Sequence, residues 1–207
     1  MSKPQVYERS FTNYLESLVE NSNSGALASL RRGVGKPPGS VAQADRYVFC
    51  RLWEDIHPWD VDRYYLIATL FALWYQGKSE LVSVERDQKN LGVSMRKMVD
   101  RMATERPREE VEKSVEVRFM ALLNSHRDDL LQHLRHNISL LKANEVPVDW
   151  TQLLHDIGGW NLDSRCVQRS WARMFWVGKK TEKETPEESE INDNSADEQN
   201  NLQGGDD

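Results

Sequence analysis

Histidines and carboxylates are the first residues in this sequence that suggest chemistry. His126, His133 and His136 fall in one short segment, and the seven-residue spacing puts His126 and His133 on the same face of a helix. A metal-dependent hydrolase would use such a set, but no His-Glu-x-x-His pattern and no cysteine pair accompanies it. The acidic runs at Glu109–Glu116 and Asp128-Asp129 are typical of solvated helix faces, whereas acid–base catalysis needs two carboxyls that converge on a cleft. We therefore predict no metal and no cofactor.

The sequence also lacks signatures of a catalytic nucleophile or of a phosphate-binding loop. Cys50 and Cys166 belong to no local nucleophile signature. The stretch Gly33-Val34-Gly35-Lys36 lacks the spacing and the serine or threonine of a phosphate-binding loop. The sequence contains no dinucleotide fingerprint, catalytic triad motif or kinase motif, so we predict that the protein is not an enzyme.

Charge is distributed unevenly along the 207 residues, whose formal net charge is −6. Residues 179–207 hold 3 lysines and 10 acids, a net charge of −7, so the body is close to neutral at +1. Within the body, the segments Arg31–Arg51 and Arg86–Arg108 each carry a local surplus of +4. Such patches bind phosphate backbones or are simply solvated faces. The acidic tail, poor in apolar residues, is predicted to be disordered; it either competes with nucleic acid for a basic face or only aids solubility.

Apolar residues recur at helical spacing through the body, and strand signals are almost absent. Helices are predicted over the apolar positions between Tyr7 and Val19, around Leu27–Leu30, and over Val41–Ile56, followed by a central helix from Tyr64 to Trp74 capped by Asp60 or Asp62. Further helices are expected over Leu91–Met102, Val111–Leu123, Leu130–Leu141, Trp150–Ile157 and about Ser164–Trp176. We predict an all-α fold with a domain boundary near Pro107, where proline interrupts the helical pattern, and with the disordered acidic tail over 179–207.

The sequence does not decide the roles of the tryptophans or of one arginine stripe. Trp74, Trp150 and Trp171 lie at core positions, whereas Trp53, Trp59, Trp160 and Trp176 lie near helix ends, where an indole packs internally, stacks on a base or anchors a partner. Arg165, Arg169 and Arg173 form a stripe whose orientation the sequence does not give. No apolar run reaches the roughly 20 residues of a membrane span, and no signal-peptide pattern opens the chain, so we expect a cytoplasmic protein without membrane contact.

Several segments, taken in order, resemble one known family. They are Gly25–Gly33, Arg63–Trp74, Asn90–Arg96, Glu116–Leu123, Ser125–Asp128, Leu134–His136 and Pro147–Trp150 with Leu153 and Leu154 after it. Together they are similar to CasB, the small subunit of the type I-E CRISPR surveillance complex Cascade. The similarity covers about residues 14–176, nearly the whole body.

The resemblance implies two small helical bundles joined end to end, an N-terminal bundle over 1–104 and a C-terminal bundle over 105–178. It also implies a non-catalytic antiviral-defence protein that assembles with the other Cascade subunits and with a second copy of itself, head to tail. Its basic surface would follow the crRNA–target DNA hybrid and hold the displaced non-target strand, stabilising the R-loop. The family's nucleic-acid-binding positions correspond to Arg31, Arg32, Arg63, Arg118, Arg127 and Arg135, with Lys36, Arg96 and Lys97 as extensions. The alternative is a helical protein–protein adaptor that touches no nucleic acid, in which arginines pair with acidic partners and tryptophans are the hot spots.

Overall fold

The computed structural model describes residues 6–84 and 90–177, and these residues form nine α-helices and no strand. The all-α prediction is therefore confirmed. The predicted tail over 179–207 lies outside the described residues. The helices are α1 Val6–Glu20, α2 Ser24–Arg31, α3 Ala42–Phe49, α4 Pro58–Trp74, α5 Leu91–Met102, α6 Arg108–Leu123, α7 Arg127–Ala143, α8 Trp150–Gly158 and α9 Cys166–Val177.

Helix α4 is the central element, as its sequence predicted. Nearly every residue from Tyr64 to Trp74 is buried, because α2, α3, α7 and α8 all pack on it. Its start differs from the prediction: Pro58 occupies the first turn, and His57 caps the helix by accepting a 3.1 Å hydrogen bond at Nδ1 from the Trp59 backbone N–H. The capping role assigned to Asp60 or Asp62 was wrong, since proline at the first helical position favours a helix that begins at Pro58.

Helix α3 is shorter than predicted. The sequence pattern suggested a helix from Val41 to Ile56, but the structure ends it at Phe49. The chain then turns, and the Trp53 ring packs edge-on against Tyr64 and 5.1 Å from the Tyr7 ring. Because His57 precedes a proline and is extended, the helix could not have continued into α4.

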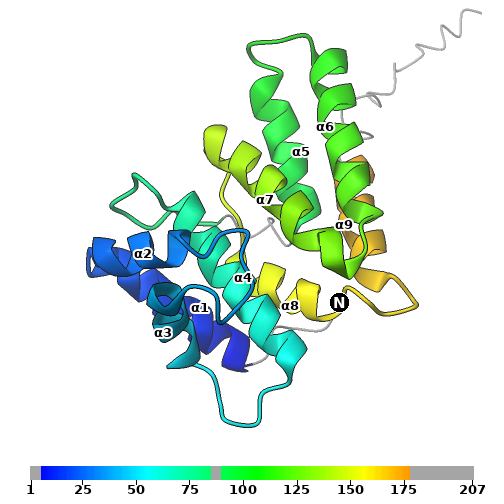
Figure 1. Cartoon of the computed structure of the whole chain (residues 1–207). Coiled ribbons are helices and arrows are strands. Elements are labelled where there is room, and N and C mark those ends of the chain that lie inside the picture. The colour runs from blue at the N-terminus through cyan, green and yellow to red at the C-terminus, as the bar shows by residue number, and fades with distance from the viewer. Residues whose placement is uncertain (1–5, 85–89, 178–207) are drawn as a thin grey trace, which may run out of the picture.

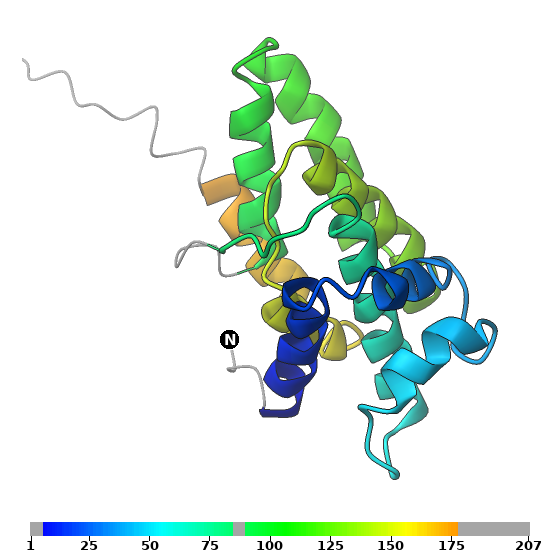
Figure 2. The same cartoon turned by 90° about the vertical axis from the view of Figure 1, so that its left-hand side faces the viewer.

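The helices are joined by one continuous hydrophobic core. Figures 1 and 2 show α5 and α6 side by side, projecting away from the end of the molecule that holds α1 and α3. Helix α5 precedes the predicted boundary at residue 105, yet it packs most extensively on α9 and also on α6 and α7. Helix α4 in turn packs on α7 and α8. The division into two bundles stays a prediction.

The aromatic core follows the sequence pattern. Trp74, Trp150 and Trp171 are buried, as predicted. Of the four tryptophans near helix ends, Trp160 is also buried and donates to the Ser125 carbonyl. No described helix is both long and apolar enough to cross a membrane.

Candidate nucleic-acid interface

The loop between α2 and α3, residues 33–40, presents the first predicted cation. Gly35 and Gly39 have φ angles of +80° and +84°, a region that favours glycine, and Pro37 and Pro38 lie between them. The Asp45 carboxylate accepts a 3.1 Å hydrogen bond from the Gly39 N–H and ties the loop to α3. The loop passes over α4 and leaves Lys36 exposed (Figure 1). Lys36 is therefore a surface cation on an anchored loop.

Helix α7 presents a row of basic residues toward the same region. Arg127, Arg135 and Lys142 are spaced by eight and seven residues, which places them on one face of the helix. A Cβ atom on Gly35 would lie 3.4 Å from Arg135 Nη1, so this guanidinium lies against the loop. Arg127 and Lys36 line one cavity between the loop and the starts of α4 and α7. The loop and the helix thus present their positive charge together.

The C-terminal end of α7 adds further cations. Burial lowers the pKa of Lys142, and the nearby positive charges of Arg31 and Lys78 lower it further. The Lys142 ammonium donates a 2.9 Å hydrogen bond to the Leu73 carbonyl at the end of α4. Lys78 follows α4, with its ammonium 4.7 Å from the Trp74 ring centroid. Arg31 and Lys78 thus lie close enough to Lys142 to act on its charge, so cations from three segments meet here.

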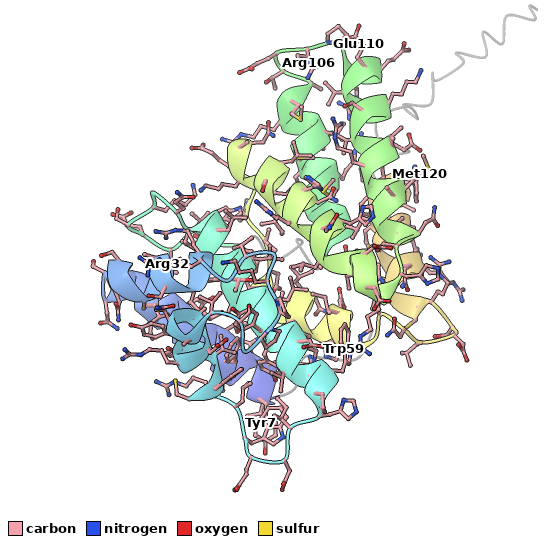
Figure 3. The ribbon with its side chains drawn as sticks, viewed as in Figure 1. Tyr7, Arg32, Trp59, Arg106, Glu110 and Met120 are labelled. Atoms are coloured by element: carbon pink, nitrogen blue, oxygen red, sulfur yellow. The ribbon has the colours of Figure 1, made fainter. Side chains whose placement is uncertain are left out.

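We call this surface the basic seam and define it as Arg31, Lys36, Lys78, Arg127, Arg135 and Lys142. Four of its members are among the residues predicted from the sequence. Arg32, another predicted residue, is not counted in the seam but is exposed beside Arg31 at the end of α2 (Figure 3). Lys78 and Lys142 were missed. The spacing of seven residues from Arg135 was a signal for Lys142, whereas the proximity of Lys78 depends on tertiary packing.

Two of the predicted arginines are engaged inside the protein. Arg63 donates 2.9 Å and 3.0 Å hydrogen bonds to Glu8 Oε1 and the Leu154 carbonyl, and it also pairs with Asp60. Its side chain is only 11% exposed. Arg96, with a side chain 8% exposed, pairs with Glu112 at 2.8 Å and Asp100 at 3.4 Å. A buried arginine held by carboxylates stabilises packing, so neither residue lies in the seam.

The remaining predicted positions lie on other elements. Arg118 is exposed on α6, donates to Ser114, and lines a separate cavity with His133 and His136. Lys97 is half-buried on α5 beside Arg96. In the predicted arginine stripe, Arg165 precedes α9 and donates to the Leu123 carbonyl, whereas Arg169 and Arg173 are exposed on α9. The structure therefore brings neither Arg118 nor the stripe to the seam.

The described part of the chain holds no cluster of three or more histidine, cysteine or acidic side chains that could bind a metal ion. A cavity of about 1030 Å³ lies along α8 and α9 and is lined by Glu8, His155 and Asp156 among others. These polar groups already have partners: Glu8 Oε2 lies 3.1 Å from His155 Nδ1, and Asp156 accepts a 2.6 Å hydrogen bond from Trp171 Nε1. These three side chains are therefore engaged inside the protein.

Asp156 makes stability depend on pH. Burial raises the pKa of this carboxyl to about 6, although hydrogen bonds from Trp171 and Gln152 favour the carboxylate. An unfolded chain releases this proton near pH 4, so the folded state loses stability as the pH rises from about 4 to about 6. Asp156→Asn should remove the loss, since its oxygen can still accept from Trp171 and the Gln152 amide can rotate. We expect urea unfolding to show a gain of about 3 kcal/mol at pH 7.5 and little change at pH 4. An equal effect at both values would contradict this assignment.

The comparisons with known proteins agree on one family. The family model described as CRISPR-associated protein Cse2 matches residues 26–176. A Cse2 protein of Thermus thermophilus is 29% identical over 182 residues, which are 87% of this chain and 96% of the relative.

Solved structures share the fold over most of the chain. CasB from Thermus thermophilus is 28% identical with a TM-score of 0.64, covering 82% of this chain and 97% of that one. CasB from M. ruber is 27% identical with a TM-score of 0.66, covering 85% and 95%. A chain of a CRISPR RNA-guided surveillance complex, 22% identical, has the same fold with a TM-score of 0.65 and covers 84% of this chain and 94% of that one. On the match of the family model, the chain belongs to the Cse2 (CasB) family of CRISPR-associated proteins.

Proposed function

We propose that this protein is a non-catalytic small subunit of a type I-E Cascade surveillance complex. In this role it binds the nucleic-acid backbone and stabilises the R-loop formed by the crRNA, the target strand and the displaced strand. Membership of the Cse2 family and the fold shared with chains of CRISPR RNA-guided surveillance complexes support the assembly. The observation that carries the binding role is the basic seam, which gathers cations from α2, the loop at 33–40, α7 and the end of α4.

The dimensions of the seam suit a polynucleotide backbone. Arg127 and Lys142 are separated by fifteen positions on α7, about 22 Å along the helix axis. At about 3.4 Å per phosphate in a helical strand, this length spans about six phosphates. The exposed arginines suit such a surface because their planar guanidinium groups pair with phosphate and stack on bases.

Energetics explain why such a contact would matter. Replacing a DNA duplex by an RNA–DNA hybrid is nearly balanced in free energy, so protein contacts to the backbone tip the exchange. Guide pairing supplies the sequence specificity in that scheme. A subunit that holds the strands therefore needs charge spread along a surface and no helix that reads bases.

A second surface suits protein partners. Val6, Tyr7, Phe49 and Trp53 are exposed by 83%, 63%, 43% and 37%, and they gather near one end of the molecule, where Figure 3 labels Tyr7. Exposed aromatic residues of this kind are favoured at protein interfaces. In the proposed assembly they contact another Cascade subunit or the second copy. They are also the observation that favours an adaptor without nucleic-acid contact.

Affinity purification of the tagged full-length chain from its host separates the two functions. The proposed function predicts large partner proteins in fixed proportion together with a short processed RNA. Ribonuclease treatment of the eluate before a second capture step controls for RNA carried over nonspecifically, since RNA held inside a complex is protected. Recovery of protein partners without nucleic acid would contradict the proposed function and support the adaptor.

A further inference from the structure

A cavity of about 330 Å³ opens within the basic seam, between the loop at 33–40 and the N-terminal turns of α4 and α7. Its wall combines the cations Lys36 and Arg127 and the carboxylates of Asp62 and Asp128 with the Trp59 ring. Its volume is at the small end of the range of ligand pockets, about 300–1,000 Å³. A planar group of the size of one nucleobase fits such a space.

Tyr65 closes one side of the cavity. It is 2% exposed, and its hydroxyl is buried without a hydrogen-bond partner among the described residues. A Cβ on Gly33 would fall on this hydroxyl, so glycine lets the loop cover it closely. The hydroxyl therefore packs beneath the loop and does not face the cavity.

The opposite wall offers a stacking surface. The Arg127 guanidinium lies 3.6 Å from the Trp59 ring centroid, and Asp62 holds it from the side at 3.6 Å. Figure 3 shows Trp59 at the start of α4. Guanidinium and indole planes both stack on nucleobases.

We infer that the cavity receives one unpaired nucleobase of the bound strand, which stacks on the Trp59–Arg127 pair. Lys36 then binds a neighbouring phosphate. This inference rests on the proposed function and adds a base-binding site to a backbone-binding surface. Because every base has a π-face, the site tolerates any sequence.

The test compares strands with and without bases. Fluorescein-labelled dT10, rU10 and a fully abasic decamer carry the same backbone charge, and fluorescence anisotropy gives their affinities for the full-length chain. We expect dT10 or rU10 to bind at least fivefold more tightly than the abasic strand, within the range measured for stacking of a single base. The DNA and RNA arms show which kind of strand supplies the base.

Substitution of the stacking ring locates the site. Trp59→Leu removes the indole and should lower the affinity for the base-containing strand about fivefold, while the abasic strand binds unchanged. Trp176→Leu is the matched control, because Trp176 is also partly buried near a helix end but does not line the cavity. Melting temperatures verify that both variants fold.

The outcomes separate the two proposals. Equal affinities for base-containing and abasic strands would overturn the base site and leave backbone binding standing. Failure of every strand to bind at low salt would overturn both. Photocrosslinking of a 5-iodouracil strand gives an independent readout: mass spectrometry should place the adduct on Trp59, and adducts confined to other peptides would overturn the base site.

Discussion

Replacing Arg31, Lys36 and Arg135 together by glutamate is expected to weaken binding of a single-stranded oligonucleotide by at least about a hundredfold at 100 mM salt. Each change removes a cation from the basic seam and adds an anion near the phosphates. Removal of three phosphate contacts should also reduce the steepness of the salt dependence by about 2 on a log–log plot. Arg127 and Lys142 are left in place because they contact Trp59 and the Leu73 carbonyl, so the fold is spared.

The matched control has the same change in net charge at another surface. Arg106, Arg169 and Arg173 are exposed and lie outside the seam; Figure 3 shows Arg106 at the far tip of the α5–α6 pair. Their replacement by glutamate should change the affinity severalfold at most. Titrations monitored by anisotropy, with circular dichroism to verify folding, provide the comparison. Similar losses in both triple variants would show that net charge, and not the seam, controls binding.

Gly92→Ala is expected to destabilise the protein by about 3 kcal/mol, at the upper end of the usual range for overpacking. Gly92 lies in the first turn of α5, where this helix crosses α9, and a Cβ there would collide with the Trp171 carbonyl oxygen and lie 2.8 Å from the carbonyl carbon. Both atoms belong to the backbone of α9, so no side chain can rotate away. One helix must shift, which loosens the most extensive helix–helix contact of the fold.

Urea unfolding and thermal melting measure this effect, and the melting temperature should fall by about 6–12 °C for a domain of this size. Gly25→Ala provides the control. Gly25 lies in the first turn of α2, and the nearest atom to its added Cβ is Asn23 Oδ1 at 3.9 Å. That variant should match the wild type within about 0.5 kcal/mol. A Gly92→Ala protein as stable as Gly25→Ala would mean that α5 and α9 do not approach as closely as described.

Helical periodicity was enough to predict most of the fold. The spacing of apolar residues in α1, α5, α7 and α9 predicted helices that the structure contains, because each buries one stripe against the core. The end of α3 was not predictable in this way, since Val48, Leu52 and Ile56 keep helical spacing although the chain turns after Phe49. Residues 50–57 follow a path set by contacts of Trp53 with Tyr7 and Tyr64, which sequence spacing does not encode.

The site was predictable only in part, for a related reason. The sequence identified cations at Arg31, Lys36, Arg127 and Arg135 but could not separate them from Arg63 and Arg96. The carboxylates that engage those two arginines include Glu8 and Glu112, which lie 55 and 16 positions away along the chain. Pairs at such separations are formed by tertiary packing. For the same reason the sequence did not indicate Lys78, which lies near Lys142 only in the folded chain.

The salt dependence of strand binding tests the central claim most directly, that the basic seam holds a nucleic-acid backbone. The affinity of the full-length chain for dT10 would be measured between 50 and 300 mM salt. With about six phosphates neutralised, the log–log slope should be about −4 for a single strand. A slope shallower than about −1, or no binding at the lowest salt, would contradict the account.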